Sequence, residues 1–329
     1  MKAIVQMRYG APERVLGMQE IEPPALRAGD VLVRVRATSV NTPDWITVTG
    51  VPYILRLGFG LRRPRTPVRG TDVAGVVEAV GRDGTDLRPG DEVFGSSWTG
   101  TLSTRGTFAE LTAVPASSLI PKPEGLSFEE AAASVMSGLT ALAAIQTLGK
   151  VTRGTRVLIN GASGGVGTFA VQIARSLGGE VTGVCSTRNL DLVRALGADH
   201  VIDYTQEDFT RGRERYDLVL DNVLNHPPSA TARVLAPGGV FMPNSVGNTG
   251  GLFAGLPRMA RAALMRLGST NVRFVNWKVG RENLKTLATF LQSGDARVVI
   301  SEVYPLADAA KAVAHMLGHH AVGKVAITA

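Results

Sequence analysis

A glycine-rich stretch near the middle of the chain has the residue types and spacing that bind phosphate. The stretch "LINGASGGVGTFAVQIARSLG" (158–178) begins as a short apolar run, continues through small residues and resumes as a helical pattern with one apolar face. Gly164 and Gly167 fall where the chain must turn tightly and admit phosphate oxygens close to backbone N–H groups. The amino end of the helix then faces the phosphate charge. The stretch predicts a dinucleotide site, with a ligand-free glycine turn as the alternative because Ala162 replaces the usual first glycine.

The residues after the next apolar strand indicate which dinucleotide is bound. About 20 residues after the glycines, sites for NAD usually carry an acidic residue that accepts a hydrogen bond from the ribose 2′-hydroxyl. This chain has "VCSTRN" there, with no carboxylate. Ser186 and Arg188 can donate to a 2′-phosphate, and the fork geometry of arginine suits that group. We therefore expect NADP(H), unless Arg188 is only a solvated residue that opens the next helix.

The elements that must position these residues differ between the two halves of the chain. Up to about residue 120, short β-rich runs such as "VLVRVRATSV" and "AGVVEAVG" alternate with Gly, Pro and Asp, as in a small antiparallel barrel-like domain. From about 125 to 285, short apolar strands alternate with helices, as a parallel sheet requires. The tail returns to strands with "ARVVISEVYPL" and "GKVAIT", which we expect to pack on the first domain. The predicted fold class is α/β, a doubly wound parallel sheet plus a β-rich domain.

Composition excludes several classes of protein. The 329 residues, 44% of them hydrophobic, are enough for roughly two domains with cores of their own. The single cysteine, Cys185, excludes an internal disulfide and any site of several thiolates within one chain. We expect no membrane span, because the apolar runs are of strand length or interrupted by arginine, and no signal peptide, which predicts the cytoplasm. The net charge is +7, but no aromatic interleaving accompanies it, so we expect no nucleic-acid partner.

Motifs along nearly the whole chain resemble one family. Their order is similar to that of the medium-chain dehydrogenase/reductase superfamily, and the "ASGGVG" turn to its zinc-free, zeta-crystallin-like quinone oxidoreductase branch. The motifs are "SGLTALAAI" (137–145), "GASGGVG" (161–167), "GADHVIDY" (197–204), "LAPGGVF" (235–241) and "GKVAIT" (323–328). The resemblance implies a GroES-like catalytic domain (1–122), a Rossmann NADP-binding domain (123–287) and a C-terminal segment (288–329) that returns to the catalytic domain. It also implies an NADPH cleft between the domains and a homodimer.

The same resemblance implies further residues around the cofactor. Tyr204 is expected beside the 2′-phosphate, and Thr140 is expected near the nicotinamide unless it is simply a helix residue. The other residues expected to bind the cofactor are Ser163, Gly164, Gly165, Val166, Gly167, Ser186, Arg188, Asn222, Val246 and Lys324.

The resemblance and the residues together predict a site without metal. Zinc-dependent relatives supply a cysteine and a His–Glu pair in the first domain, where this chain has "VNTPDW" (40–45) and "RGTDVAG" (69–75). All five histidines lie in the later half. His315, His319 and His320 fall near a predicted helix end without nearby thiolates, so we interpret them as surface or cap residues.

A hydride site without zinc must rely on orienting a carbon that is already electrophilic. Quinones and α,β-unsaturated carbonyl compounds qualify, because conjugation spreads the incoming charge onto oxygen. Such a site needs donors near that oxygen and a route for a proton, and the matching segments offer Asn41, Asp44 and Tyr53 as catalytic residues. Asp44 can instead cap a helix or pair with an arginine, and Tyr53 can instead pack on a loop. The sequence therefore predicts an NADPH-dependent reductase of a small quinone or enone.

Two other functions remain compatible with the sequence. The chain could be a non-catalytic dinucleotide-binding protein with a regulatory or nucleic-acid-associated role, or an enoyl-thioester reductase, which needs a route for a phosphopantetheine arm.

Two basic segments, 55–70 and 252–267, combine arginines with apolar residues. They could form a lid or a patch that touches membranes. We interpret them, and the arginines in them, as ordinary solvated or dimer-packing surface.

Overall fold

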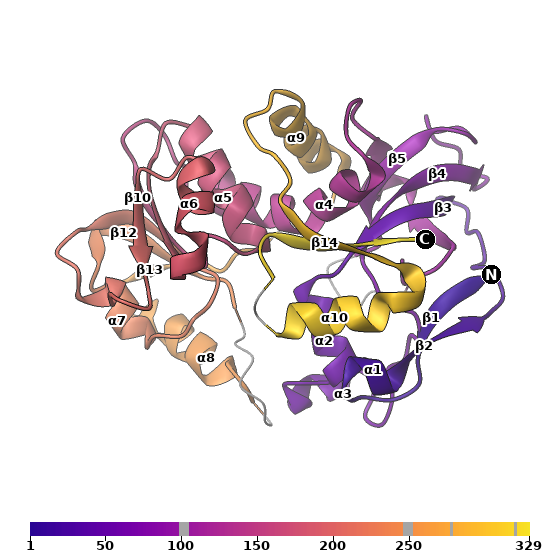
Figure 1. Ribbon diagram of the computed structural model, residues 1–329, viewed down its shortest axis with the longest axis horizontal. Coiled ribbons are helices and arrows are strands. Elements are labelled where there is room, and N and C mark those ends of the chain that lie inside the picture. The colour runs from indigo at the N-terminus through magenta and orange to yellow at the C-terminus, as the bar shows by residue number, and fades with distance from the viewer. Residues whose placement is uncertain (99–104, 246–252, 277–278, 319–320) are drawn as a thin grey trace. The chain divides into compact units, whose positions relative to one another are not determined.

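The computed structural model describes residues 1–98, 105–245, 253–276, 279–318 and 321–329. The chain forms two compact units, labelled by element in Figure 1. The first unit comprises Met1–Leu139, Lys278–Ser293 and Ile300–Ala329, and the second comprises Thr140–Trp277 and Gly294–Val299. This division differs from the expected boundaries after residues 122 and 287, since the long helix α4 (Phe128–Leu142) begins in the first unit and ends in the second.

The first unit is built on a seven-stranded sheet. The strand order is β14-β15-β3-β4-β5-β7, with β6 also paired to β3, and every pair except β14 with β15 is antiparallel. In β3, Val31, Val33 and Val35 are buried while Arg34 and Arg36 are exposed, so one face of the strand packs into the core. The strands of this unit are β1 (Lys2–Gln6), β2 (Leu16–Glu20), β3 (Asp30–Ser39), β4 (Asp72–Val80), β5 (Glu92–Ser96), β6 (Leu111–Pro115), β7 (Leu119–Pro121), β14 (Ile300–Pro305) and β15 (Lys324–Thr328).

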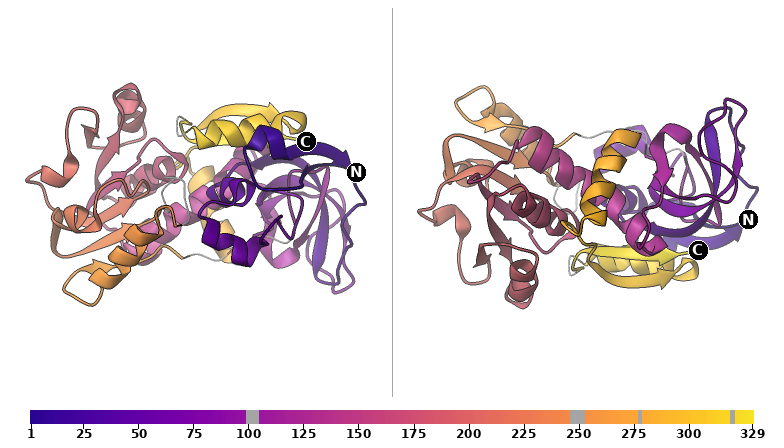
Figure 2. Two further views of the ribbon diagram at one scale, coloured as in Figure 1. Left: turned by 90° about the horizontal axis from the view of Figure 1, so that it is seen from below. Right: turned by 90° about the horizontal axis from the view of Figure 1, so that it is seen from above.

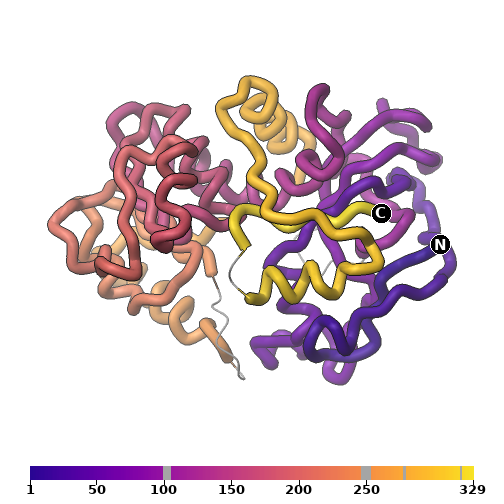
Figure 3. The backbone as a smooth tube through the Cα atoms, viewed as in Figure 1, coloured from indigo at the N-terminus to yellow at the C-terminus, as the bar shows by residue number. Residues whose placement is uncertain are grey.

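The helices of the first unit include a short helix that begins next to Asn41 and contains Asp44. That helix, α2 (Thr42–Thr49), has Pro43 in its first turn and ends at Gly50, whose φ of 66° is the left-handed conformation that stops a helix. The other helices are α1 (Pro12–Val15), α3 (Arg56–Phe59), α9 (Arg281–Gln292) and α10 (Ala309–Leu317). The chain ends in this unit, because β15 pairs with β3 and places Ala326 opposite Ser39; both termini lie there (Figure 3).

The expectation that no apolar segment is long enough for a membrane span was wrong. The continuous helix Phe128–Leu148, α4 with its final π-helical turn, is 21 residues long and apolar enough to pass that test. However, 83% of its most apolar window is buried inside the protein, as in the core helix of a folded domain. The length of an apolar segment therefore does not distinguish a membrane span from a buried helix here. This helix is apolar because most of its surface packs inside the protein.

The second unit is a six-stranded parallel sheet with helices packed on it (Figures 1 and 2). Its strand order, β10-β9-β8-β11-β12-β13, is that of a doubly wound dinucleotide-binding sheet. All strands are parallel, and the order in which the chain adds strands to the sheet reverses between β8 and β11. The central strand reads "RVLIN" and is buried on both faces, which explains its unbroken apolar run. The strands are β8 (Arg156–Asn160), β9 (Glu180–Cys185), β10 (His200–Asp203), β11 (Tyr216–Asp221), β12 (Leu235–Pro243) and β13 (Asn271–Val272). The helices are α5 (Gly165–Ser176), α6 (Leu190–Ala195), α7 (Pro228–Ala232) and α8 (Leu256–Met265).

Candidate active site

The glycine turn joins β8 to α5 in the second unit. Gly161 has a φ of 79°, and Gly164 lies immediately before the first residue of α5, Gly165, with Val166 next in the helix. A Cβ on Gly167 would lie 2.1 Å from the Gly161 carbonyl oxygen, so this glycine lets the helix pack against the turn. A Cβ on Gly164 would meet only that same oxygen, at an ordinary 3.4 Å. The protein itself therefore leaves space at Gly164, at the amino end of a helix where a phosphate can bind.

The ends of β9 and β10 bring the residues expected around the 2′-phosphate to one edge of the sheet. Ser186 follows β9 and Tyr204 follows β10, and the Tyr204 N–H donates to the Cys185 carbonyl oxygen at 3.1 Å. Arg188 is exposed in the turn after β9, and Tyr204 is 56% exposed. Because parallel strands end together, Ser186, Arg188 and Tyr204 lie at the same edge of the sheet, and none of the three is buried.

Asn189 is a residue of this edge that the sequence reasoning missed. Its side chain is buried, and Nδ2 donates to Ser163 Oγ at 3.0 Å and to Ser186 Oγ at 3.3 Å. It thereby ties the glycine turn to the end of β9. The available signal was a polar residue between Arg188 and Leu190 at the start of a helix, which by pattern alone reads as a cap.

The remaining residues expected at the cofactor fall in different places. Asn222 follows β11 and donates from Nδ2 to the Asn160 carbonyl oxygen at 3.3 Å, where the sheet order reverses. Thr140 is buried in α4. Val246 lies outside the described residues. Lys324 belongs to the first unit, where it contacts the residues expected to be catalytic.

Asn41 and Asp44 lie in a buried polar cluster at the start of α2. Asp44 Oδ2 accepts the Asn41 N–H at 2.8 Å, and Asp44 Oδ1 accepts the Gly70 N–H at 3.0 Å. The Asn41 side chain donates from Nδ2 to Asp72 Oδ2 at 2.8 Å and accepts from Lys324 Nζ at 2.5 Å. The four side chains are at most 3% exposed. Asp44 thus caps the helix, as the alternative interpretation has it, and is also one member of a network that orders Asn41 completely.

Burial controls the protonation of this cluster. It raises the pKa of Asp44 to about 7, helped by the charge of Asp72 and opposed by the Asn41 N–H and the charges of Lys324 and Arg69. Burial also raises the pKa of Asp72 and lowers that of Lys324. Asp44 is therefore a carboxyl that exchanges its proton near neutral pH, which is the property of a general acid.

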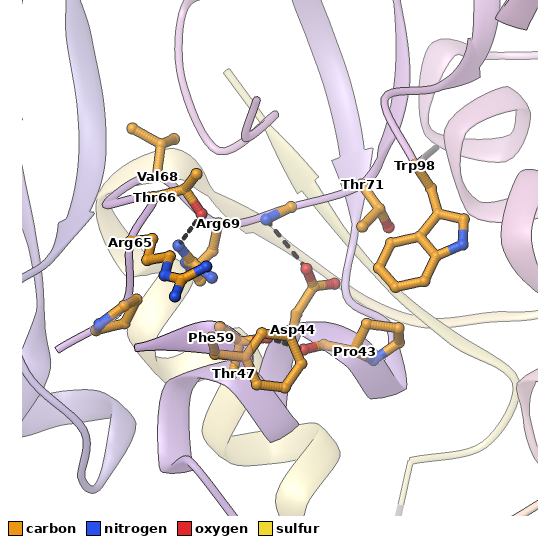
Figure 4. Close-up of a pocket in the computed structure, with 12 residues that line it drawn as sticks. Pro43, Asp44, Thr47, Phe59, Arg65, Thr66, Val68, Arg69, Thr71 and Trp98 are labelled. Carbon is orange, nitrogen blue, oxygen red and sulfur yellow. Dashed lines mark hydrogen bonds between the residues drawn. The ribbon is translucent and has the colours of Figure 1, made fainter. Parts of the chain in front are cut away.

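Asp44 lines a pocket of about 180 Å³ within the first unit (Figure 4). Its carboxyl points from α2 toward the loop that carries Arg69 and Gly70. The other lining residues are Pro43, Thr47, Phe59, Pro64, Arg65, Thr66, Val68, Arg69, Gly70, Thr71 and Trp98. Part of the basic segment 55–70 therefore forms a wall of this pocket.

Two arginines of segment 55–70 are not the solvated surface groups that we expected. Arg69 is only 6% exposed and lines the pocket. Arg56 lies over the rings of Tyr9 and Tyr53, at 4.3 and 4.5 Å from their centroids, because cations stack on aromatic faces. Tyr53 itself is 45% exposed and does not line the pocket, so this geometry does not bring it together with Asn41 and Asp44.

Comparison with known proteins places this geometry in a family. An alcohol dehydrogenase GroES-like domain matches residues 27–124, and a zinc-binding dehydrogenase domain matches residues 196–327. A zinc-type alcohol dehydrogenase-like protein of Schizosaccharomyces pombe is 33% identical over 97% of this chain and 94% of its own length. A chloroplastic quinone oxidoreductase of Triphysaria versicolor is 32% identical over 99% and 98%. A trans-enoyl reductase of Aspergillus terreus is 35% identical over 84% and 80%.

A solved structure agrees with these relatives over the full chain. The quinone oxidoreductase from Coxiella burnetii superposes with a TM-score of 0.87 at 28% identity, covering 100% of this chain and 99% of that one. The chain belongs to the medium-chain dehydrogenase/reductase superfamily, in its quinone oxidoreductase branch. The predicted fold class, a doubly wound sheet with a GroES-like domain, is confirmed. This medium-chain dehydrogenase/reductase is therefore an oxidoreductase of a superfamily that binds a nicotinamide dinucleotide.

The name of one matching domain raises the question of zinc. Across the described part of this medium-chain dehydrogenase/reductase, no three His, Cys, Asp or Glu side chains gather in a way that could hold a metal ion. Cys185, the single cysteine of the chain, is buried in β9, and burial raises the pKa of its thiol to about 11. His315 Nδ1 lies 3.2 Å from Tyr304 Oη and 3.4 Å from Glu302 Oε2. His319 and His320 lie outside the described residues. The donor set described here does not fit a zinc site.

Proposed function

We propose that this medium-chain dehydrogenase/reductase uses NADPH to reduce a quinone or an α,β-unsaturated carbonyl compound without zinc. The observation that carries the proposal is the pocket of the first unit, where Asp44, with a pKa of about 7, lies beside apolar walls. A conjugated carbonyl compound needs a proton donor and a dry, apolar surface rather than a Lewis acid, because its own conjugation accepts the charge.

The second unit would hold the cofactor through four groups. The N–H groups at the start of α5, next to the space left at Gly164, would receive the pyrophosphate. Ser186, Arg188 and Tyr204 would surround the 2′-phosphate at the ends of β9 and β10. When bound, NADPH supplies the hydride.

The first unit would hold the substrate and supply the proton. Phe59 and Trp98 offer aromatic surface to a planar ring. Near pH 7 about half of the Asp44 carboxyls carry a proton that they can donate to the oxygen on which charge develops. Asn41, held by Lys324 and Asp72, fixes the amino end of α2 and therefore the position of Asp44.

Reduction of an enoyl thioester is the second candidate function. The trans-enoyl reductase among the relatives favours it, and the chemistry at Asp44 is the same. The pocket of about 180 Å³ is large enough for the conjugated head group only, so a thioester would have to leave its long arm outside. A homodimer, which the family resemblance implies, and a cytoplasmic location, which the sequence indicates, stay predictions.

The test is NADPH oxidation, followed by absorbance, with a panel of 1,2- and 1,4-quinones, enals, enones and an enoyl thioester. We expect turnover with quinones or enones, undiminished after dialysis against a chelator. Tight NADPH binding without turnover of any acceptor would favour a non-catalytic dinucleotide-binding protein. One tightly held zinc per chain, with activity lost on its removal, would contradict the zinc-free assignment.

A further inference from the structure

The pocket of the first unit contains a buried guanidinium that forms no ion pair among the described residues. Arg69 is 6% exposed and lines the pocket beside Asp44. Its Nη2 donates to Thr66 Oγ1 at 2.9 Å, while its buried Nε has no partner among the described residues. A buried charge with unused donors costs free energy, and that cost is recovered when a partner of opposite charge binds.

Asp44 neutralises Arg69 only in part. Both oxygens of Asp44 already accept backbone N–H groups, from Asn41 and Gly70, and among the described residues its charge acts on Arg69 without an ion pair between the two side chains. Burial raises the pKa of Asp44 to about 7, so it is half neutral at physiological pH, whereas burial lowers the pKa of Arg69 only to about 10. Arg65, which is exposed, adds a second positive charge to the wall. The pocket therefore favours an anion.

The walls limit the ligand to one ring. A volume of about 180 Å³ is close to the roughly 150 Å³ cavity that holds a benzene molecule in another protein. Phe59, Trp98 and Val68 supply apolar surface, and the arginine fork is the geometry that pairs with a carboxylate through two parallel hydrogen bonds.

We propose that this pocket recognises a carboxylate on a one-ring substrate and that Arg69 binds that carboxylate. The inference rests on the proposed function, and it narrows the substrate class to quinones or cyclic enones that carry an acid group. Arg69 then sets specificity, and Asp44 keeps its proton more firmly when the anion is present because like charges repel.

The test uses benzoate and benzamide as a pair of one-ring probes that differ in charge. Their binding to the full chain is measured by titration calorimetry, without cofactor and without turnover. We expect benzoate to bind more tightly than benzamide by roughly tenfold to a hundredfold, the range for a hydrogen bond to a charged group. In Arg69→Gln this preference should disappear. In Arg62→Gln, which loses the same charge from an exposed residue outside the pocket, it should persist.

Each outcome decides the proposal. Equal binding of the two probes by the parent chain overturns it whether or not Arg69→Gln folds, and so does a preference that survives in folded Arg69→Gln. Phe59→Ala, which removes a half-buried wall, should weaken both probes, and unchanged binding would place them elsewhere. Because the readout needs no cofactor, absent turnover with intact benzoate preference would contradict only the proposed function. Turnover of neutral quinones without that preference would contradict only this inference.

Discussion

Asn189 donates a 3.0 Å hydrogen bond to Ser163 and so joins the glycine turn to the edge of the sheet where the 2′-phosphate is expected. The same Nδ2 reaches Ser186 at 3.3 Å. One buried amide therefore positions a residue of the turn and a residue after β9. This arrangement couples the pyrophosphate end of the proposed cofactor site to its ribose end.

Asn189→Ala should weaken NADPH and NADH to a similar extent. The amide orders a turn that both cofactors use, and losing two neutral hydrogen bonds corresponds to at most roughly fivefold to 150-fold in affinity. Fluorescence titrations of both cofactors measure this. Gln206→Ala, an exposed change just after Tyr204, is the control and should leave both affinities unchanged. Unaltered binding in folded Asn189→Ala would mean that the turn orders itself without this residue.

Gly164→Ala and Gly167→Ala should separate ligand binding from folding. At Gly164 the new methyl group meets only the Gly161 oxygen at 3.4 Å, so the fold should tolerate it while NADPH affinity falls. At Gly167 it would lie 2.1 Å from that oxygen, so thermal stability should fall even without cofactor. Thermal unfolding of the cofactor-free chain and NADPH titration together distinguish the two effects. Equal affinity for NADPH in Gly164→Ala and the parent would mean that the pyrophosphate is bound elsewhere.

Asp44 should impose a pH dependence on the reduction of quinones or enones. Its pKa is raised to about 7, so the proton is present below that pH and lost above it, and kcat/KM should fall as pH rises through about 7. The charges of Asp72, Lys324 and Arg69 act on this carboxyl. Asp44→Asn should lower kcat/KM and remove the decline. A parent profile that stays flat or rises through neutral pH would contradict this role.

The control for Asp44 is an exposed carboxylate of the same unit. Asp83→Asn removes the same charge from an exposed residue outside the pocket and should keep the parent pH profile. If Asp83→Asn shifts the profile as much as Asp44→Asn does, the titrating group is not in the pocket.

Lys324→Met should destabilise the fold strongly. The ammonium is 3% exposed and donates to the Val40 carbonyl oxygen at 2.8 Å and to Asn41, and its charge offsets the buried Asp72. Removing one partner of such a buried arrangement costs about 3 to 5 kcal/mol. Urea denaturation measures the loss, and Lys311→Met, on an exposed pair with Asp308, should cost little. A loss below about 1 kcal/mol would contradict a charged Lys324 that stabilises Asp72 in the folded chain.

Local patterns predicted the parts of the site that lie on short stretches of chain. The glycine turn and Ser186 follow from the alternation of strands and helices, because the ends of parallel strands must meet, whereas Tyr204 was expected only from the family resemblance. The contact of Lys324 with Asn41 joins residues 283 positions apart, and no local pattern reports it. The sequence places Arg69 at the surface, where arginine usually lies, yet the side chain is 6% exposed.

The cofactor preference of Arg188→Ala is the measurement that tests the central claim most directly. Initial rates with one quinone or enone give kcat/KM for NADPH and for NADH, in the parent and in the variant, at one ionic strength. The account predicts that the parent prefers NADPH, that Arg188→Ala loses roughly tenfold to a hundredfold with NADPH and little with NADH, and that added salt reduces the preference. A parent that prefers NADH, or an equal loss with both cofactors, would contradict it.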